Sequence, residues 1–364
     1  MDVAAPGLEG VIADETTISL VDGESGRLLY RGYRIEELVG RGTYEQTVAL
    51  LLEGSWPAGT PPLPDPAPLP AAVDATLRSL PGGASPLDAL RTAVSVWGIV
   101  EEISYPPHPN QAWRLLTFAP AALGAFARLR GGEEPVDQEG AGGLGVAGRY
   151  LYFVSGERPD PAAERALDAY FTVGAEHGFN ASTFALRVII STRSDLASGV
   201  VGAIGALKGP LHGGAPSEVE AQLAEMGSAE QAEQWMREAL ARGERLMGFG
   251  HRVYRARDPR ADALRKVAEE LAGDDEWLLL AMEVEPIALR LLEERHPDRQ
   301  LPTNVEYYAS AVLRGTGLTP DLYTPAFAVA RMAGWCAHAL EQAEKGRLIR
   351  PRARYVGPTP EDRR

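Results

Sequence analysis

The chain has 364 residues but a single cysteine, Cys336, so it cannot form a disulfide within itself, and it fits a reducing compartment. The apolar neighbours of Cys336 in AGWCAHAL favour a packed thiol over a reactive one. The N-terminus lacks the basic start and apolar stretch of a secretion signal, and the sequence has no run of 18 or more apolar residues. We therefore expect a cytoplasmic protein without a membrane-spanning segment.

Positive charge is scarce, because 36 lysines and arginines stand against 50 aspartates and glutamates, giving a net charge of -14. A chain this acidic repels the phosphates of nucleic acids and of anionic membranes, so we expect neither as a partner. Lysine occurs only at Lys208, Lys266 and Lys345, and arginine supplies the rest. Since guanidinium groups bind planar carboxylates through two hydrogen bonds, gathered arginines would suit a small anionic ligand.

The signatures of several enzyme classes are missing as well. The sequence has neither the H-E-x-x-H pair of zinc enzymes nor the G-x-S-x-G elbow of nucleophilic serine enzymes, so we expect no metal site and no covalent catalysis. Residues 143–148, GLGVAG, match the dinucleotide pattern by letter. No predicted strand precedes them and no strand-helix-strand unit surrounds them, so we interpret the match as accidental.

Helical periodicity dominates the chain after a short N-terminal segment. Residues 11–32 alternate apolar and polar residues around the turn signal DGESG, which predicts one or two short hairpins. Apolar residues at three- and four-residue spacing predict helices in TYEQTVALLLEG, PLDALRTAVSVWGIVEE, QAWRLLTFAPAALGAFARLR, PAAERALDAYFTVGAEHG, SAEQAEQWMREALARGERLMG and DPRADALRKVAEELAG. Asp160-Pro161 and Asp258-Pro259 mark two helix starts. The sequence predicts a mainly α protein with a small N-terminal β element.

Residues 55–70 contain seven prolines and predict an extended, solvated connection rather than a helix. The same composition is typical of a ligand for proline-binding domains, which is the alternative interpretation.

Four short segments place chemically useful side chains beside backbone bends or helix starts. They are AEHGFNAST with His177, LKGPLHGGAPSE with His212, MGFGHRVYRARDPRA with His251 and Arg260, and NVEYY with Glu306. Such a combination of histidine, arginine and acid predicts that the four segments assemble into one site.

Two of these residues have a specific chemical interpretation. Pro216 predicts a helix start just after His212, where the positive end of the helix dipole would keep the imidazole neutral and able to donate to a carbonyl. The flanking Gly213 and Gly214 would admit a ligand closely, although a histidine that caps a turn is the alternative. Glu306 lies between apolar and aromatic residues, and desolvation would raise its pKa toward the range of a general base. A structural ion pair with an arginine is the alternative for Glu306.

In this order, the segments resemble the citrate synthase family, and the resemblance covers nearly the whole chain. It also includes GLEGVIADETTISLVDGESGRLLYRGYRIEELV, NVEYYASAVLRGTGL, DLYTPAFAVARMAGWCAHALEQ and RLIRPRARYVG. The resemblance implies a mainly α, two-domain helical fold, with residues 1–211 and 313–364 in a large domain and residues 212–312 in a small domain that closes over the active site. It also implies a homodimer.

The resemblance further implies si-type condensation of acetyl-CoA with oxaloacetate, giving citrate and CoA with no metal and no bound cofactor. By motif position, His212 would polarise the thioester carbonyl, Glu306 would remove a methyl proton, and His251 would protonate the oxaloacetate carbonyl. The residues expected to bind oxaloacetate are His177, Asn180, Arg260, Arg331 and, reaching across the dimer interface, Arg350. The candidates for the CoA phosphates are Arg252, Arg255, Arg257 and Lys266.

Two positions depart from the family pattern. Glu306 stands where N-V-D-F-Y has aspartate, and Pro216 stands where G-G-A-N-E has asparagine. A misplacement of about 1 Å in a reacting group costs about 100-fold in rate, so the longer Glu306 leaves two alternatives to an efficient citrate synthase open. One is a 2-methylcitrate synthase that uses propionyl-CoA, since a pocket discriminates weakly against one methylene. The other is a homologue with weak activity and a binding or regulatory role.

Overall fold

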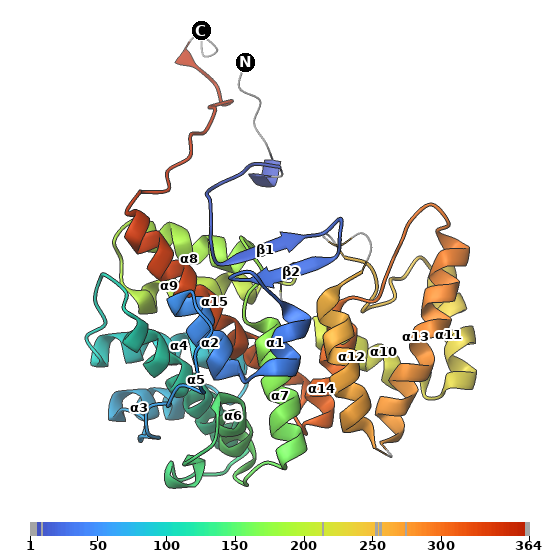
Figure 1. The fold of residues 1–364 in the computed structure, drawn as a ribbon, viewed down its shortest axis with the longest axis horizontal. Helices are drawn as coiled ribbons and strands as arrows, with labels where there is room; N and C mark the ends of the chain where they lie inside the picture. Colours follow the sequence, from blue (N-terminus) through green and yellow to red (C-terminus); the bar gives the residue numbers. More distant parts are fainter. Residues whose placement is uncertain are drawn as a thin grey trace.

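The structure, a computed structural model, describes residues 6–8, 10–212, 215–251, 254, 257–273 and 275–360. Within these residues the protein is mainly helical with one small sheet, which confirms the predicted fold class (Figure 1). The helices are α1 (Ile35–Arg41), α2 (Tyr44–Glu53), α3 (Ala71–Ser79), α4 (Pro86–Val100), α5 (Pro109–Arg130), α6 (Val146–Ser155), α7 (Pro161–Gly174), α8 (Ala181–Ser191), α9 (Leu196–Leu207), α10 (Ala215–Met226), α11 (Ala229–Ala241), α12 (Pro259–Ala272), α13 (Glu276–Arg295), α14 (Val305–Gly315) and α15 (Tyr323–Lys345). Three short 3₁₀ helices are η1 (Pro6–Leu8), η2 (Glu139–Ala141) and η3 (Pro320–Leu322).

The predicted N-terminal β element is an antiparallel sheet with strand order β1 (Ser19–Asp22), β2 (Arg27–Tyr30) and β3 (Tyr33–Arg34). Strands β1 and β2 form a hairpin in which Asp22 pairs with Arg27. The Asp22 carboxylate accepts hydrogen bonds from the backbone and hydroxyl of Ser25, which closes the turn that DGESG predicts.

The predicted helix starts are present. Asp160 accepts a hydrogen bond from the Ala162 amide at 2.7 Å, and Asp258 accepts one from the Arg260 amide at 3.1 Å. These carboxylates cap α7 and α12, each of which has proline in its first turn. Pro216 likewise lies in the first turn of α10, as predicted.

Two further predictions concern the GLGVAG segment and the proline-rich segment. Residues 143–148 run from a loop into α6, and no strand precedes that helix in the described part of the chain after β3, which agrees with an accidental match. Residues 57–70 form no helix or strand and connect α2 to α3, which confirms an extended connection. The connection is not fully solvated as predicted, because the apolar side chains of Leu63 and Leu69 pack against the core.

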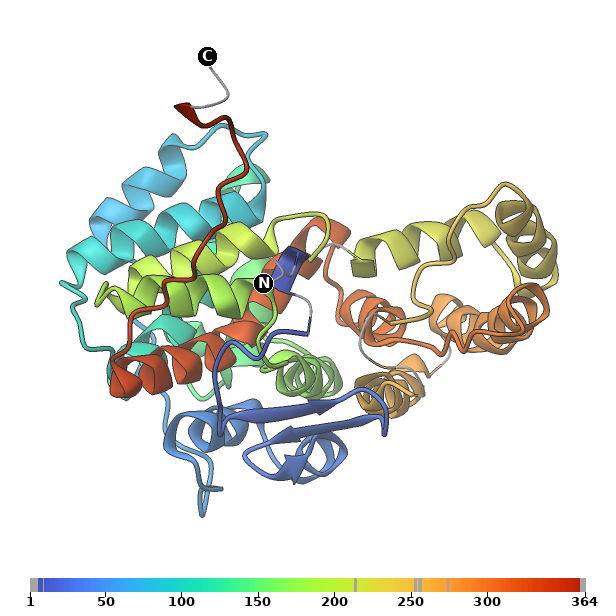
Figure 2. The same cartoon turned by 90° about the horizontal axis from the view of Figure 1, so that it is seen from above.

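The core surrounds α15, which α2, α5, α7, α8 and α9 contact (Figure 2). Trp335 and Cys336 of α15 are almost completely buried. Burial raises the pKa of the Cys336 thiol to about 12, so it stays protonated and unreactive, as the sequence predicted.

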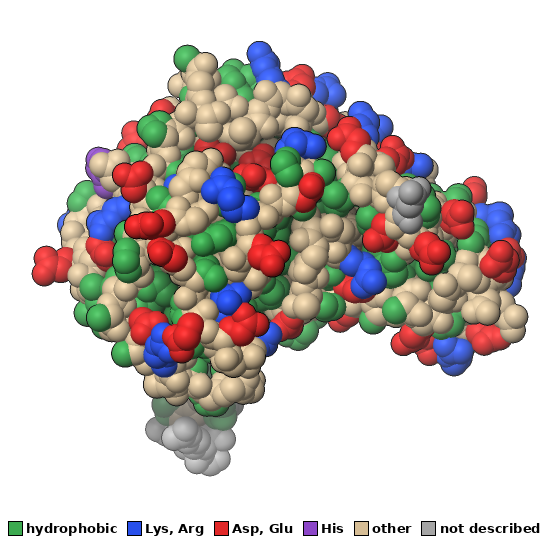
Figure 3. Space-filling view, turned by 90° about the horizontal axis from the view of Figure 1, so that it is seen from below, with side chains coloured by type: hydrophobic (Ala, Val, Ile, Leu, Met, Phe, Trp, Pro, Cys, Tyr) green, Lys and Arg blue, Asp and Glu red, His purple; other side chains and the backbone are tan. Residues whose placement is uncertain are grey.

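Helices α10 to α14 form a smaller lobe to one side of the molecule (Figures 1 and 2). This lobe joins the rest through α12, which packs on α1 and α7, and through α14, which packs on α7. Seen from below, acidic and basic side chains are interspersed over both lobes (Figure 3). No helix among the described residues is both long and apolar enough to cross a membrane.

Candidate active site

Two loops of the smaller lobe are hydrogen-bonded to each other and bring His251 near the start of α14. Gly250 N donates to Pro302 O at 2.7 Å, and Asn304 N donates to Gly248 O at 2.9 Å. The side chain of Asn304 adds a bond of 2.7 Å to Gly250 O. Gly248 and Gly250 have φ of 86° and 75°, a region that favours glycine, so the GFG sequence permits this bend.

His251 lies between two hydrogen-bond donors. The amide of Tyr254 is 3.0 Å from His251 Nδ1, and Arg260 Nη2 is 3.2 Å from Nε2. A neutral imidazole has one acceptor nitrogen, so the ring accepts from one of these two donors and carries its proton on the other nitrogen. Burial, and next the charge of Arg260, lower the pKa of His251 to about 4, so the ring is neutral at pH 7. The site therefore places the Arg260 guanidinium beside a neutral imidazole.

Asp258 holds this arrangement in place. Its carboxylate binds Arg260 through two hydrogen bonds of 3.0 and 2.9 Å, and both side chains are buried. It also accepts a hydrogen bond of 3.0 Å from the Val305 amide. Asp258 therefore ties the starts of α12 and α14 together in addition to capping α12, a role that its Asp-Pro motif alone does not reveal.

His177 follows α7 and faces the same region. Its Nε2 is 3.2 Å from the Tyr254 hydroxyl, and its ring centroid is 5.8 Å from that of His251. Burial lowers the pKa of His177, and the charges of Arg260, Arg331, His251 and His212 lower it further. His177 is therefore neutral. Because four site residues act on its pKa, the three predicted histidine segments lie close to one another.

His212 contacts the start of α8. The Ser182 amide lies 3.3 Å from His212 Nε2 and can only donate, so Nε2 accepts and the proton is on Nδ1. The Ser182 hydroxyl is 2.8 Å from the same nitrogen and also accepts from Trp335 Nε1 at 3.1 Å. Ser182 and Trp335 thus fix the imidazole in the tautomer that offers Nδ1–H to a ligand.

The predicted neutrality of His212 is supported, because burial, followed by the charge of Arg331, lowers its pKa to about 4. The contribution expected from the start of α10 stays a prediction. The neighbouring Gly213 and Gly214 lie outside the described residues.

Glu306 lies in the first turn of α14 and is partly buried. Burial raises its pKa to about 7, while the charges of Arg260 and Arg331 oppose this shift and that of Asp258 adds to it. The Glu306 carboxylate makes no ion pair or hydrogen bond with any described residue, so the alternative of a structural ion pair is wrong. A carboxylate with this pKa suits proton transfer near neutral pH.

Arg331 of α15 is 2% exposed and is held by one hydrogen bond, from Nε to Gly174 O at 2.6 Å, and by packing over the Phe327 ring. Its charge lowers the pKa of both His177 and His212. The other guanidinium nitrogens make no hydrogen bond or ion pair with a described residue, and the role of Arg331 in binding a ligand carboxylate stays a prediction.

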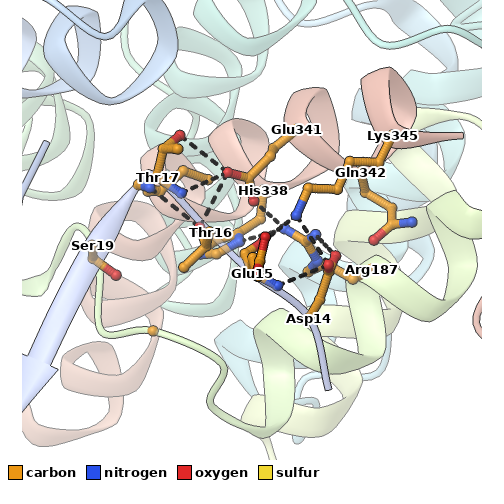
Figure 4. A network of polar contacts seen from close by, with 12 residues as sticks. Asp14, Glu15, Thr16, Thr17, Ser19, Arg187, His338, Glu341, Gln342 and Lys345 are labelled. Atoms are coloured by element: carbon orange, nitrogen blue, oxygen red, sulfur yellow. Dashed lines mark hydrogen bonds and ion pairs between the residues drawn. The ribbon is translucent and has the colours of Figure 1, made fainter. Parts of the chain in front are cut away.

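A polar network surrounds the buried Arg187 and His338 (Figure 4). Arg187 donates to His338 Nδ1 at 3.0 Å, so His338 carries its proton on Nε2, which donates to Glu176 at 3.1 Å. Arg187 also pairs with Asp14 and Glu341, each at 2.7 Å, and so ties the N-terminal segment to α8 and α15. Burial favours a raised pKa for Glu176, but His338 and Arg331 outweigh it and hold the carboxyl ionised.

The remaining predicted site residues lie in a helix cap, in an exposed segment or in a second pocket. Asn180 caps α8, and its amide group is occupied within the turn by Thr183, Ser182 and two backbone carbonyls. Arg350 is exposed on the extended segment that follows α15. Arg257 and Lys266 line a separate pocket between α1, α7 and α12. The roles given to these four residues stay predictions. Arg252 and Arg255 lie outside the described residues.

Sequence reasoning missed Tyr254, Ser182, Trp335 and Glu176 as parts of the site. Tyr254 and Glu176 are adjacent to predicted residues in two of the marked segments, and that adjacency was the available signal. Ser182 also lies in a marked segment, AEHGFNAST, but its contact with His212, and that of Trp335 with Ser182, depend on the fold. In the part of the chain that the structure describes, no group of three or more histidines, cysteines or acids is placed to hold a metal ion.

Comparison with known proteins gives a consistent answer. Residues 7–352 match the family model for the citrate synthase C-terminal domain. The chain is 38% identical to citrate synthase 2 of Bacillus subtilis, over 98% of this chain and 96% of that protein. It is 39% identical to the citrate synthase of Haloferax volcanii, over 96% and 95% of the two chains.

Solved structures agree with these relatives. The citrate synthase of Pyrobaculum aerophilum has a TM-score of 0.84 and 34% identity, covering 99% of this chain and 95% of that one. The citrate synthase of Thermoplasma acidophilum, solved in a ternary complex with carboxymethyl coenzyme A and oxaloacetate, has a TM-score of 0.85 and 28% identity, covering 99% and 97%. Motifs, fold and relatives agree over almost the full length, and the chain therefore belongs to the citrate synthase family.

Proposed function

We propose that this protein condenses acetyl-CoA with oxaloacetate and releases citrate and free CoA. The observation that carries this proposal is the Glu306 carboxylate, which has a pKa of about 7 and no partner among the described residues, in one site with the neutral His212 and His251. A methyl group next to a thioester is a weak acid, so its ionisation requires both a base and a donor to the carbonyl oxygen.

The first step is proton transfer. Glu306 removes a proton from the acetyl methyl group, the electron pair forms the carbon-carbon double bond of an enolate, and the thioester oxygen, which takes the negative charge, accepts the hydrogen bond of His212 Nδ1–H. A neutral imidazole stabilises the enolate by donating this hydrogen bond while it keeps its own proton. Ser182 contributes by holding His212 Nε2 as an acceptor.

The second step forms the carbon-carbon bond. The enolate carbon attacks the ketone carbon of oxaloacetate, the thioester carbonyl re-forms, and the ketone oxygen takes up a proton from His251 beside Arg260. Glu306 then releases the methyl proton to solvent, and His251 regains a proton from solvent. Water then cleaves the thioester of the citryl product, and citrate and CoA leave. His177, Asn180, Arg260 and Arg331 hold the oxaloacetate carboxylates, because charge-assisted hydrogen bonds position a dianion strongly.

The wider assembly is part of the same proposal. The protein works in the cytoplasm as a homodimer with si-type stereochemistry and no bound cofactor, and Arg350 reaches the active site across the dimer interface. The exposed segment that carries Arg350 supports this role. Residues 212–312 close over the large domain, formed by residues 1–211 and 313–364, once oxaloacetate is bound. The Thermoplasma acidophilum relative, solved with oxaloacetate and a CoA derivative, supports the choice of substrates.

The test is release of free CoA thiol by the purified protein, with acetyl-CoA and with propionyl-CoA, each with and without oxaloacetate. The proposal predicts oxaloacetate-dependent release with a higher kcat/KM for acetyl-CoA. A higher kcat/KM for propionyl-CoA would make the protein a 2-methylcitrate synthase instead. No release with either, from folded protein that still binds oxaloacetate, would leave a binding or regulatory role.

A further inference from the structure

Tyr254 packs against three residues of the candidate site. It lies in the segment between α11 and α12, on the smaller lobe, and its side chain is 1% exposed. Its ring centroid is 4.9 Å from that of His251 and 5.7 Å from that of His177. The Arg260 guanidinium lies over the same ring, 5.5 Å from its centroid. The aromatic ring therefore supports two histidines and an arginine at once.

The Tyr254 hydroxyl has one partner among the described residues. It lies 3.2 Å from His177 Nε2 and makes no other hydrogen bond in the described part of the chain. A buried hydroxyl costs free energy unless it is hydrogen-bonded, whereas phenylalanine would supply the same ring without this cost. The bond to His177 therefore explains why the ring at this position carries a hydroxyl.

This hydrogen bond joins the smaller lobe to the rest of the molecule. His177 lies between α7 and α8, whereas Tyr254 lies between α11 and α12 (Figure 1). The backbone of Tyr254 is fixed within its own lobe, because its amide lies 3.0 Å from His251 Nδ1. Tyr254 thus connects the histidine of one lobe with the histidine of the other.

The position of the ring proton of His177 decides what this bond contributes. Burial keeps the pKa of His177 low, so the neutral ring has one donor nitrogen and one acceptor nitrogen. Nε2 contacts the Tyr254 hydroxyl, and Nδ1 makes no hydrogen bond with a described residue, which leaves Nδ1 for a ligand. A carboxylate only accepts hydrogen bonds and therefore requires the proton on Nδ1. Nε2 must then accept, and the hydroxyl must donate.

His212 has the same arrangement, with Ser182 in place of the tyrosine. The amide and the hydroxyl of Ser182 lie 3.3 and 2.8 Å from His212 Nε2, and the proton is on Nδ1. We propose that Tyr254 is a positioning residue of the condensation, whose hydroxyl donates to His177 Nε2 and so presents His177 Nδ1–H to an oxaloacetate carboxylate. The proposal rests on the proposed function and adds a residue to it.

The experiment removes the hydroxyl and keeps the ring, by Tyr254→Phe. Oxaloacetate affinity, measured by titration calorimetry, is expected to fall about tenfold, the effect of losing one hydrogen bond. KM for oxaloacetate should rise by about the same factor while kcat changes less than about twofold, because His177 binds the substrate and takes part in no bond change.

The nitrogen-15 NMR shifts of the His177 ring give a readout that a loss of packing would not move. With oxaloacetate bound, the wild type should show a protonated Nδ1 and an unprotonated Nε2, and Tyr254→Phe should populate both tautomers. A double-mutant cycle gives a second check. In a His177→Ala background, Tyr254→Phe should not weaken oxaloacetate binding further, since the hydroxyl acts through His177.

The matched control is Tyr150→Phe. Tyr150 is also buried, and its hydroxyl makes one hydrogen bond, of 3.2 Å to Leu322 O, away from the candidate site. This variant should leave oxaloacetate affinity unchanged. Unchanged affinity in Tyr254→Phe, an equal loss in Tyr150→Phe, or a wild-type His177 ring protonated on Nε2 would overturn the proposal.

Failure of this proposal is distinguishable from failure of the proposed function, because affinity and tautomer are measured without turnover. Oxaloacetate binding that depends on the Tyr254 hydroxyl, without any thiol release, would refute the condensation and keep the role of Tyr254. Full thiol release by Tyr254→Phe, at an unchanged KM for oxaloacetate, would do the reverse.

Discussion

The rate of condensation should depend on pH through Glu306. With a pKa of about 7, most Glu306 side chains are protonated at pH 6 and most are ionised at pH 8. The ionised fraction therefore rises about tenfold between these pH values, and kcat/KM for acetyl-CoA should rise by the same factor and then level off. His212 and His251, whose pKa values are about 4, stay neutral over this range and do not contribute to the rise.

The assay is the initial rate of thiol release at saturating oxaloacetate, measured from pH 5.5 to pH 8.5 in buffers of constant ionic strength. Glu306→Gln should lose at least about 100-fold in rate, and its residual rate should show no rise near pH 7. A wild-type rate that is flat or falling between pH 6 and pH 8 would refute the assignment of Glu306 as the base.

The raised pKa of Glu306 also makes the stability of the folded protein depend on pH. The pKa of Glu306 is raised in the folded protein, so its contribution to stability is present below about pH 4.5 and is lost as pH rises through 7. Glutamine resembles the protonated acid. Glu306→Gln should therefore be about 1–2 kcal/mol more stable than the wild type at pH 8, after a discount for the partial exposure of the carboxylate, and similar to it at pH 5. Urea denaturation at the two pH values measures the difference, and equal stability at pH 8 would contradict the raised pKa.

Three other substitutions test separate parts of the structure. Arg331→Ala should weaken oxaloacetate binding by about 10- to 100-fold by calorimetry, because a buried carboxylate contact is lost, and unchanged affinity would count against the site. Ser182→Ala should lower kcat by about tenfold with little change in oxaloacetate affinity, since His212 loses one partner, and a full kcat would remove that partner from the mechanism. Gly334→Ala should destabilise the protein by about 1–3 kcal/mol in urea, because its Cβ would lie 2.3 Å from a buried carboxylate oxygen. Gly205→Ala, in open space on α9, is the matched control and should not destabilise.

Much of the fold was predictable because local signals agreed with it. Helices α7 and α12 have periodic apolar residues, an aspartate cap and a proline in the first turn, and each begins where these signals predict. Helix α13 was not singled out, and it contains Pro286 within an otherwise helical stretch. Its length depends on packing against α11 and α12, and such contacts between helices cannot be deduced from the periodicity of one segment.

The site residues were predictable as a set, but their physical states were not. His251 and Glu306 come together because the Gly248–Gly250 bend is hydrogen-bonded to the segment before α14, a pairing between distant residues that no local pattern indicates. The neutrality of His212 was expected from a helix start, and the structure adds burial and the charge of Arg331, which lower its pKa. Burial depends on the whole fold, so this cause could not be predicted from the sequence.

The central claim is that Glu306 is the base of a condensation carried out by this site. The most direct measurement is formation of citrate from acetyl-CoA and oxaloacetate, followed by mass spectrometry for the wild type and Glu306→Gln, with oxaloacetate affinity measured for both. We predict citrate in amounts equal to the released CoA for the wild type, at least about 100-fold less for the variant, and equal oxaloacetate affinity. No citrate from the wild type, or undiminished citrate from Glu306→Gln, would contradict the claim.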